Sequence, residues 1–129
     1  MFQRFVLAFS LSLMASTALA ADGPLQIYVS KADQTLTVYD GDVVVATSKV
    51  STGKPGHTTP SGIFSILEKR KYHESNIYSN APMPFMQRLT WSGIALHEGK
   101  VPNYPASHGC VRLPEVFAEK LYDVTTHGM

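Results

Sequence analysis

The only cysteine of the chain, Cys110, lies close to two histidines and an arginine. A thiol with the ordinary pKa of ~8.5 is largely protonated near neutrality, so a cysteine nucleophile needs an imidazole or another positive group within hydrogen-bond reach. His97 and His108 are the two candidate imidazoles, and both lie within thirteen residues of the cysteine. These residue types and their spacing indicate nucleophilic catalysis by Cys110.

The two histidines differ in how the chain can present them to the thiol. His108 is two positions from Cys110, and in an extended strand such residues share a face with ~6 to 7 Å between their Cα atoms. His97 is separated from the cysteine by a loop, so its imidazole can be placed opposite the sulfur. We assign the general base to His97 and expect a backbone carbonyl just after it, such as that of Glu98, to hold its second nitrogen.

Gly109 lies directly before the cysteine and leaves the backbone beside the sulfur uncovered. The N–H groups around Gly109 and Cys110 can therefore approach a developing oxyanion. Residues 96–113 thus combine a candidate nucleophile, a candidate base and a candidate oxyanion site in one stretch of the chain.

The seven residues Ser-His-Gly-Cys-Val-Arg-Leu at 107–113 resemble the signature around the nucleophile of the L,D-transpeptidase (YkuD-type) family. Ser-Thr-Gly-Lys at 51–54 and Thr-Pro-Ser-Gly-Ile-Phe at 59–64 resemble the other recurrent stretch of that family. The resemblance runs from about Leu25 to the C-terminal helix. It implies a β-sandwich-like catalytic domain, which in this family commonly continues with one more strand after the helix, where this sequence stops.

The resemblance also implies a reaction and its partners. Cys110 attacks the carbonyl between the third residue of a peptidoglycan tetrapeptide stem, commonly diaminopimelate, and D-alanine; D-alanine leaves and a thioester forms. An acceptor amine on a second stem then gives a crosslink. Attack by water instead gives L,D-carboxypeptidase activity, which remains an alternative. Peptidoglycan stems and acceptor amines are thus the expected partners, and no cofactor or metal is expected.

The family pattern assigns roles to the remaining residues of the signature. His97 matches the base. His108 helps to shape the pocket and the oxyanion site, together with Ser107 and Gly109. Arg112 falls where the family carries Arg or Asn, and its planar guanidinium suits a stem carboxylate.

Two readings from other functional classes compete with the enzyme. A zinc protein could use His97, His108 and Cys110, since imidazole and thiolate are good zinc ligands, but the spacing of the last two is unusual and no fourth ligand is apparent. A non-catalytic peptidoglycan-binding module could keep the fold, yet it would have no reason to retain the thiol and the imidazole together.

The N-terminus predicts export. Residues 1–20 combine a short positive start, an apolar run and small residues before Ala21, as in a secretory signal, and the run is too short to favour a permanent membrane anchor. The mature domain is then residues 21–129, in the periplasm or cell envelope. The 11 basic and 10 acidic residues nearly balance, which gives no indication of a nucleic-acid surface. A single cysteine excludes an internal disulfide.

Hydrophobic patterning predicts a β-rich α+β domain. Alternating apolar residues between positions 25 and 45 predict three short strands in a meander, and the apolar run at 63–67 predicts a fourth. Residues 68–84 lack a period, so we expect a long loop or lid there.

The second half of the chain predicts two further strands and a helix. The strands are expected at 85–90 and 93–96, and the second of them delivers His97. Trp91 and Tyr104 are expected to pack rather than to bind substrate. After Pro114, apolar residues recur at helical spacing and predict one amphipathic helix of about three turns. The apolar positions of that helix are Phe117, Leu121 and Val124.

Overall fold

The computed structural model describes residues 25–75 and 81–129. The predicted signal at residues 1–20 lies outside these ranges, as does the part of the predicted loop at residues 76–80. Within the described ranges, no helix combines the length and the apolar character needed to cross a bilayer.

The first sheet is the predicted three-stranded meander. Its strands, all antiparallel to their neighbours, are β1 (Gln26–Ser30), β2 (Thr35–Asp40) and β3 (Val43–Lys49). Asp40 pairs with Val43 across a tight turn in which Gly41 has φ 63°. A glycine adopts this left-handed conformation at little cost, so the polar Asp-Gly-Asp sequence closes the hairpin.

The second sheet has four short strands in sequence order. They are β4 (Glu68–Arg70), β5 (Met86–Arg88), β6 (Ala95–Glu98) and β7 (Val111–Leu113). The pairs β4–β5 and β5–β6 are antiparallel, whereas β6 and β7 are parallel. A tight turn cannot join parallel neighbours, so residues 99–110 cross over as a long loop. That loop carries four of the predicted site residues.

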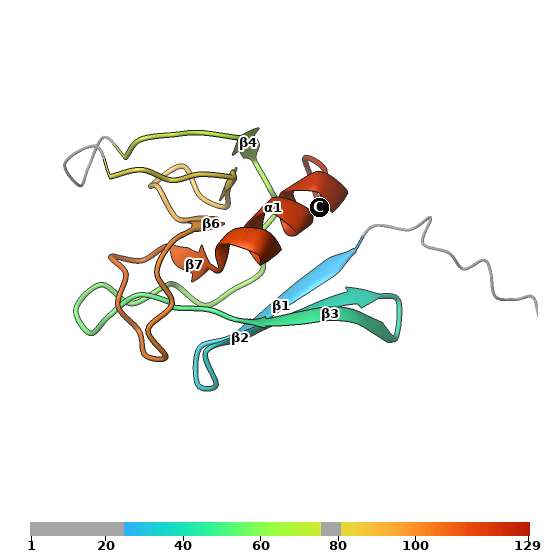
Figure 1. The fold of residues 1–129 in the computed structure, drawn as a ribbon, viewed down its shortest axis with the longest axis horizontal. Coiled ribbons are helices and arrows are strands. Elements are labelled where there is room, and N and C mark those ends of the chain that lie inside the picture. Colours follow the sequence, from blue (N-terminus) through green and yellow to red (C-terminus); the bar gives the residue numbers. More distant parts are fainter. Residues whose placement is uncertain (1–24, 76–80) are drawn as a thin grey trace, which may run out of the picture.

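The helix α1 (Glu115–Val124) follows Pro114, as predicted. It packs where the two sheets face each other (Figure 1), and its Ala118 and Leu121 are buried. Val124, predicted to lie on the apolar face, is exposed, because the helix ends there and the next residue, Thr125, turns inward and donates a hydrogen bond to Gln87 Oε1 (2.6 Å).

Both sheets and the helix share one main core. Its buried members are Leu36, Val38, Val50, Leu96, Val111, Leu113, Ala118 and Leu121. Two sheets with a single C-terminal helix around this core confirm the predicted β-rich α+β, sandwich-like class.

The predicted fourth strand is wrong in its position. Residues 63–67 form no strand of either sheet, and Ile63 is fully exposed. The backbone of Ile66 instead bonds to the C-terminal tail, donating to Met129 O (2.9 Å) and accepting from Gly128 N–H (2.8 Å). The strand begins only at Glu68, inside the predicted loop, because Glu68 to Arg70 pair with β5. The other described residues of that predicted loop are irregular except for one bridge, between Glu74 and Pro82.

Candidate active site

Side-chain alternation on β6 and β7 separates the main core from a second face. Leu96 and its register partner Val111 belong to the core. Successive residues of a strand point to opposite faces, so His97 and its register partner Arg112 point away from that core. Cys110 comes directly before Val111 and shares the second face. Folding therefore brings the predicted nucleophile, base and arginine onto one side of a parallel strand pair.

This second face lines a pocket of about 450 Å³. The volume is typical of sites that bind small molecules or short peptides. Five of the six predicted site residues line it: His97, Ser107, His108, Cys110 and Arg112.

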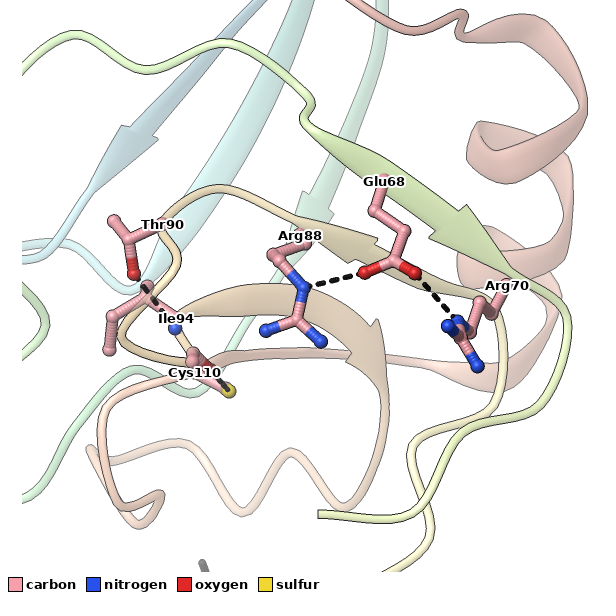
Figure 2. A network of polar contacts seen from close by, with 7 residues as sticks. Glu68, Arg70, Arg88, Thr90, Ile94 and Cys110 are labelled. Atoms are coloured by element: carbon pink, nitrogen blue, oxygen red, sulfur yellow. Dashed lines mark hydrogen bonds and ion pairs between the residues drawn. The ribbon is translucent and has the colours of Figure 1, made fainter. Parts of the chain in front are cut away.

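Cys110 is half-buried and packs beside Ala95. Its Sγ donates a hydrogen bond to the carbonyl of Gly93 (3.4 Å; Figure 2). Burial raises the pKa of the Cys110 thiol, while a backbone hydrogen bond from Ala95 and the positive charges of Arg88 and Arg112 act in the opposite direction. The resting group is therefore a thiol, and its proton is held by the β5–β6 turn.

That turn is held by Thr90. Its hydroxyl accepts a hydrogen bond from the N–H of Ile94 (3.0 Å; Figure 2) and bonds to the hydroxyl of Ser92 (2.8 Å). The backbone N–H groups of Leu89 and Thr90 also donate to the carbonyl of Ile94. These bonds fix the position of the Gly93 carbonyl beside the sulfur.

His97 is buried, with 9% of its surface exposed. Its Nδ1 lies 2.6 Å from the carbonyl oxygen of Glu98, as the sequence predicts. A carbonyl can only accept, so Nδ1 carries the proton and Nε2 keeps its lone pair. Burial lowers the pKa of His97, the hydrogen bond to Glu98 raises it, and Arg112 lowers it. The imidazole is thus neutral near pH 7, with Nε2 as its basic atom.

Ser107 and Gly109 shape the turn before the cysteine. The Ser107 hydroxyl donates to the carbonyl of Cys110 (2.5 Å) and accepts from the N–H of Gly109 (3.0 Å). Gly109 has φ 131°, and a Cβ there would lie 2.9 Å from Ile94 Cδ1, so only glycine fits. Because its N–H is already bonded to Ser107, Gly109 can serve an oxyanion only by exchanging this partner.

The segment around Gly53 and Thr59 braces this turn from outside. The Thr59 hydroxyl donates to the carbonyl of Gly109 (2.6 Å) and accepts from the N–H of Gly53 (2.9 Å). Ser51 and Arg112 exchange two backbone hydrogen bonds, of 3.1 and 2.8 Å. The two sequence stretches that carried the family resemblance are therefore one hydrogen-bonded unit.

His108 and Arg112 lie at the open side of the pocket. His108 is exposed, and its ring meets that of His57 edge-on, with centroids 5.0 Å apart. The aliphatic part of Arg112 passes so close to Gly99 that a Cβ there would lie 3.0 Å from Arg112 Cγ. Within the described part of the chain, the guanidinium of Arg112 makes no ion pair, so it can receive an anion.

A family model of the L,D-transpeptidase catalytic domain, YkuD, matches residues 24–129. The chain belongs to this family. Solved structures agree with that assignment, while comparison with curated proteins gave no match. An L,D-transpeptidase from Stackebrandtia nassauensis is 28% identical, with a TM-score of 0.75 over 84% of this chain and 54% of that one.

L,D-transpeptidase 1 from Mycobacterium tuberculosis is 28% identical, with a TM-score of 0.70 over 81% of this chain and 58% of that one. An L,D-transpeptidase solved in complex with imipenem is 27% identical, with a TM-score of 0.72 over 81% of this chain and 56% of that one. The chain therefore spans little more than half the length of these solved relatives.

In this L,D-transpeptidase domain, the pocket lining includes residues to which the sequence analysis gave no role, among them His73, Arg88 and Lys100. Trp91, which was expected only to pack, lines the pocket too. Trp91 and Tyr104, expected to pack rather than to bind substrate, are 73% and 60% exposed, so neither side chain is packed in the core. The Trp91 ring lies 5.8 Å from the Cζ of Arg88 at the pocket wall. The alternation of the predicted strand at 85–90 could have placed Arg88 on the same face as Met86.

Metal-ligating side chains do not gather at this site. Across residues 25–75 and 81–129, no three of His, Cys, Asp and Glu are arranged so that they could hold one ion. The Cys110 sulfur, moreover, bonds to a carbonyl oxygen. The geometry thus gives the zinc reading no support.

Proposed function

We propose that this domain is a peptidoglycan L,D-transpeptidase that is exported to the periplasm or cell envelope, with Cys110 as nucleophile and His97 as general base. The observation that carries this proposal is the shared face of β6 and β7. That face presents the thiol, a neutral imidazole with its proton on Nδ1, and a guanidinium that makes no ion pair with any described residue to one pocket. Membership of the YkuD family supplies the substrate class, the peptidoglycan stem.

The first half-reaction follows from these groups. The thiol proton passes from Sγ to Nε2 of His97, and Sγ attacks the carbonyl carbon between the third stem residue and D-alanine. The tetrahedral intermediate collapses with cleavage of the C–N bond. The leaving amine takes the proton from Nε2, D-alanine departs, and the acyl group remains on Cys110 as a thioester.

The second half-reaction restores the enzyme. An acceptor amine gives a proton to Nε2 and attacks the thioester carbonyl; the C–S bond breaks and the thiolate regains a proton. Arg112 binds a stem carboxylate on the acyl side, because its charge has no partner ion in the described structure. His108 and Ser107 form part of the pocket wall beside the reacting carbonyl, and Gly109 shapes the turn that carries them.

Product analysis distinguishes the two fates of the thioester, which are transfer of its acyl group to an amine and hydrolysis by water. Purified protein is incubated with a tetrapeptide stem, with and without an excess of an acceptor stem that carries a free side-chain amine, and the products are identified by mass spectrometry. We expect a crosslinked product that increases with acceptor concentration. Release of the trimmed tripeptide alone, at every acceptor concentration, would favour the carboxypeptidase.

The relative solved with imipenem suggests an independent probe of the thiol. A strained β-lactam carbonyl is open to attack by the same sulfur, so a carbapenem should add its mass to the protein at Cys110. The adduct should be absent from Cys110→Ala. Protein with a titratable free thiol that gains no mass under excess carbapenem would argue against this pocket and for a binding module.

A further inference from the structure

Arg88 is a second guanidinium at the candidate active site, and neither the sequence motif nor the family assignment gives it a role. It lies on β5, the strand beside β6, and lines the same pocket as the thiol. Its side chain is 17% exposed, so the charge is held largely away from water. A charge in such a position needs a fixed partner, and Glu68 provides one.

Glu68 holds Arg88 by one edge only. Glu68 Oε1 accepts from Arg88 Nε (2.8 Å), and Oε2 accepts from Arg70 Nε (2.8 Å). Figure 2 shows the two terminal nitrogens of Arg88 turned away from Glu68, toward the side where the Cys110 sulfur lies. Within the described residues these two nitrogens have no hydrogen-bond partner. Since one carboxylate is shared by two guanidinium groups, the cluster keeps a net positive charge.

The sheet register places Arg88 at a defined distance from the nucleophile. Arg88 pairs with Ala95 on one side of β6. On the other side of β6, Leu96 pairs with Val111, so the preceding residue, Cys110, lies alongside Ala95. Neighbouring strands are about 4.8 Å apart, so the backbones of Arg88 and Cys110 are separated by roughly 10 Å. Ala95, between them, is buried, while the side chains of Arg88 and Cys110 both line the pocket.

A single amino-acid residue fits the span of the pocket between Arg88 and Cys110. One residue spans about 3.8 Å between Cα atoms, and an arginine side chain covers most of the remaining distance. His97, two residues after Ala95 on the same face of β6, lines the pocket as well. A leaving residue bound in this pocket would thus have its amine near His97 and its carboxylate near Arg88.

We propose that Arg88, aligned by Glu68, binds the terminal carboxylate of the D-alanine that leaves the donor stem. The inference rests on the proposed function. It assigns the two guanidinium groups to opposite sides of the scissile bond, Arg88 to the leaving side and Arg112 to the acyl side. The charge of the pocket is consistent with the binding of carboxylates. Arg88, Lys100 and Arg112 line the pocket, and Glu98 is the single carboxylate among the described lining residues.

The test compares a donor stem that ends in a free carboxylate with the same stem ending in a carboxamide. The readout is kcat/KM for release of D-alanine or D-alaninamide. Wild-type protein should prefer the free acid by at least about tenfold, the usual range for a charge-assisted hydrogen bond. Arg88→Gln should abolish this preference, because it should slow the acid stem much more than the amide stem. The ratio of the two kcat/KM values cancels any effect of Arg88 on the reactivity of the thiol, because both stems react with the same thiol.

Three further variants complete the test. Arg70→Gln removes the other guanidinium that contacts Glu68. Because Arg70 does not line the pocket, this variant should keep the preference for the free acid. Arg112→Gln should keep that preference too. Arg88→Lys keeps the charge but not the paired terminal nitrogens, so it should retain only part of the preference; it also serves as the test if Arg88→Gln is unstable.

Four outcomes would overturn the assignment of Arg88: a wild-type enzyme without the preference, equal slowing of both stems by Arg88→Gln, an undiminished preference in Arg88→Lys, or loss of the preference in Arg112→Gln instead. Failure of wild-type protein to process either stem would overturn the proposed function itself.

Discussion

At Cys110 and His97, burial shifts both ionisation equilibria toward the uncharged forms. It raises the pKa of the Cys110 thiol and lowers that of the His97 imidazole. The resting pair is therefore a neutral thiol and a neutral imidazole rather than an ion pair. The thiol hydrogen points to the Gly93 carbonyl in this structure, so the proposed mechanism requires it to turn toward Nε2 when substrate binds.

This arrangement predicts unequal effects of the two histidines. His97→Ala should reduce stem turnover by at least about 100-fold, because general-base catalysis contributes that much or more, whereas His108→Ala should cost much less. The rate of Cys110 alkylation by iodoacetamide at neutral pH reports on the thiol directly, and it should fall in His97→Ala but hardly in His108→Ala. Equal slowing in both variants would show that the roles are wrongly assigned.

The lowered pKa of His97 also predicts how stability depends on pH. Since the folded pKa lies below the unfolded value of about 6.5, the unfolded chain binds the proton first as the pH falls. The contribution of His97 to the free energy of unfolding is complete at pH values above the unfolded pKa. It is lost as the pH drops toward the folded pKa. Urea midpoints between pH 8 and 5 should decrease less steeply for His97→Gln than for wild type. Parallel slopes would contradict a buried, neutral His97.

At the scale of elements, the nucleophile turn depends on a segment about fifty residues earlier in the chain. Thr59 connects Gly53 to the carbonyl of Gly109, and Ser51 pairs with Arg112. These contacts explain why two separated stretches of sequence carry one family signature: the first holds the backbone from which the second presents its thiol.

Replacing Gly53 should damage this brace specifically. A Cβ at Gly53 would lie 1.8 Å from the carbonyl oxygen of His57, whereas a Cβ at Gly41 meets no atom within 4 Å. Gly41→Ala should cost about 1 kcal/mol for its left-handed backbone. Gly53→Ala should lower the free energy of unfolding by at least about 2 kcal/mol more, measured by urea denaturation. Similar losses in the two variants would show that the segment is not tightly packed.

At the scale of the whole molecule, local patterns predicted the elements that depend on local contacts. The meander of β1 to β3 and the helix α1 follow from alternation, turn residues and helical spacing. Residues 63–67 have the composition of a strand, yet their backbone partners are Arg88 and the C-terminal tail, which no local pattern reveals. The polar β4 is a strand only because β5 pairs with it.

The same distinction holds for the candidate site. Cys110, His97 and Arg112 could be predicted because the chemistry of a thiol and a short motif single them out. Strand alternation could assign Arg88 to a face, but the place of Arg88 and Trp91 in the pocket depends on the register of β5 against β6 and on the exposure of the turn between them. Motif residues are visible in sequence, but a pocket wall is a property of the folded sheet.

The most direct test of the central claim is the mass of the intact protein after incubation with a tetrapeptide stem in the absence of acceptor. Wild-type protein should gain the mass of the stem minus D-alanine, as a thioester that hydroxylamine removes. Cys110→Ala, shown by circular dichroism to keep its fold, should gain no mass and release no D-alanine. Release of D-alanine by Cys110→Ala at the wild-type rate would contradict the account, because the reaction would then not pass through the thiol.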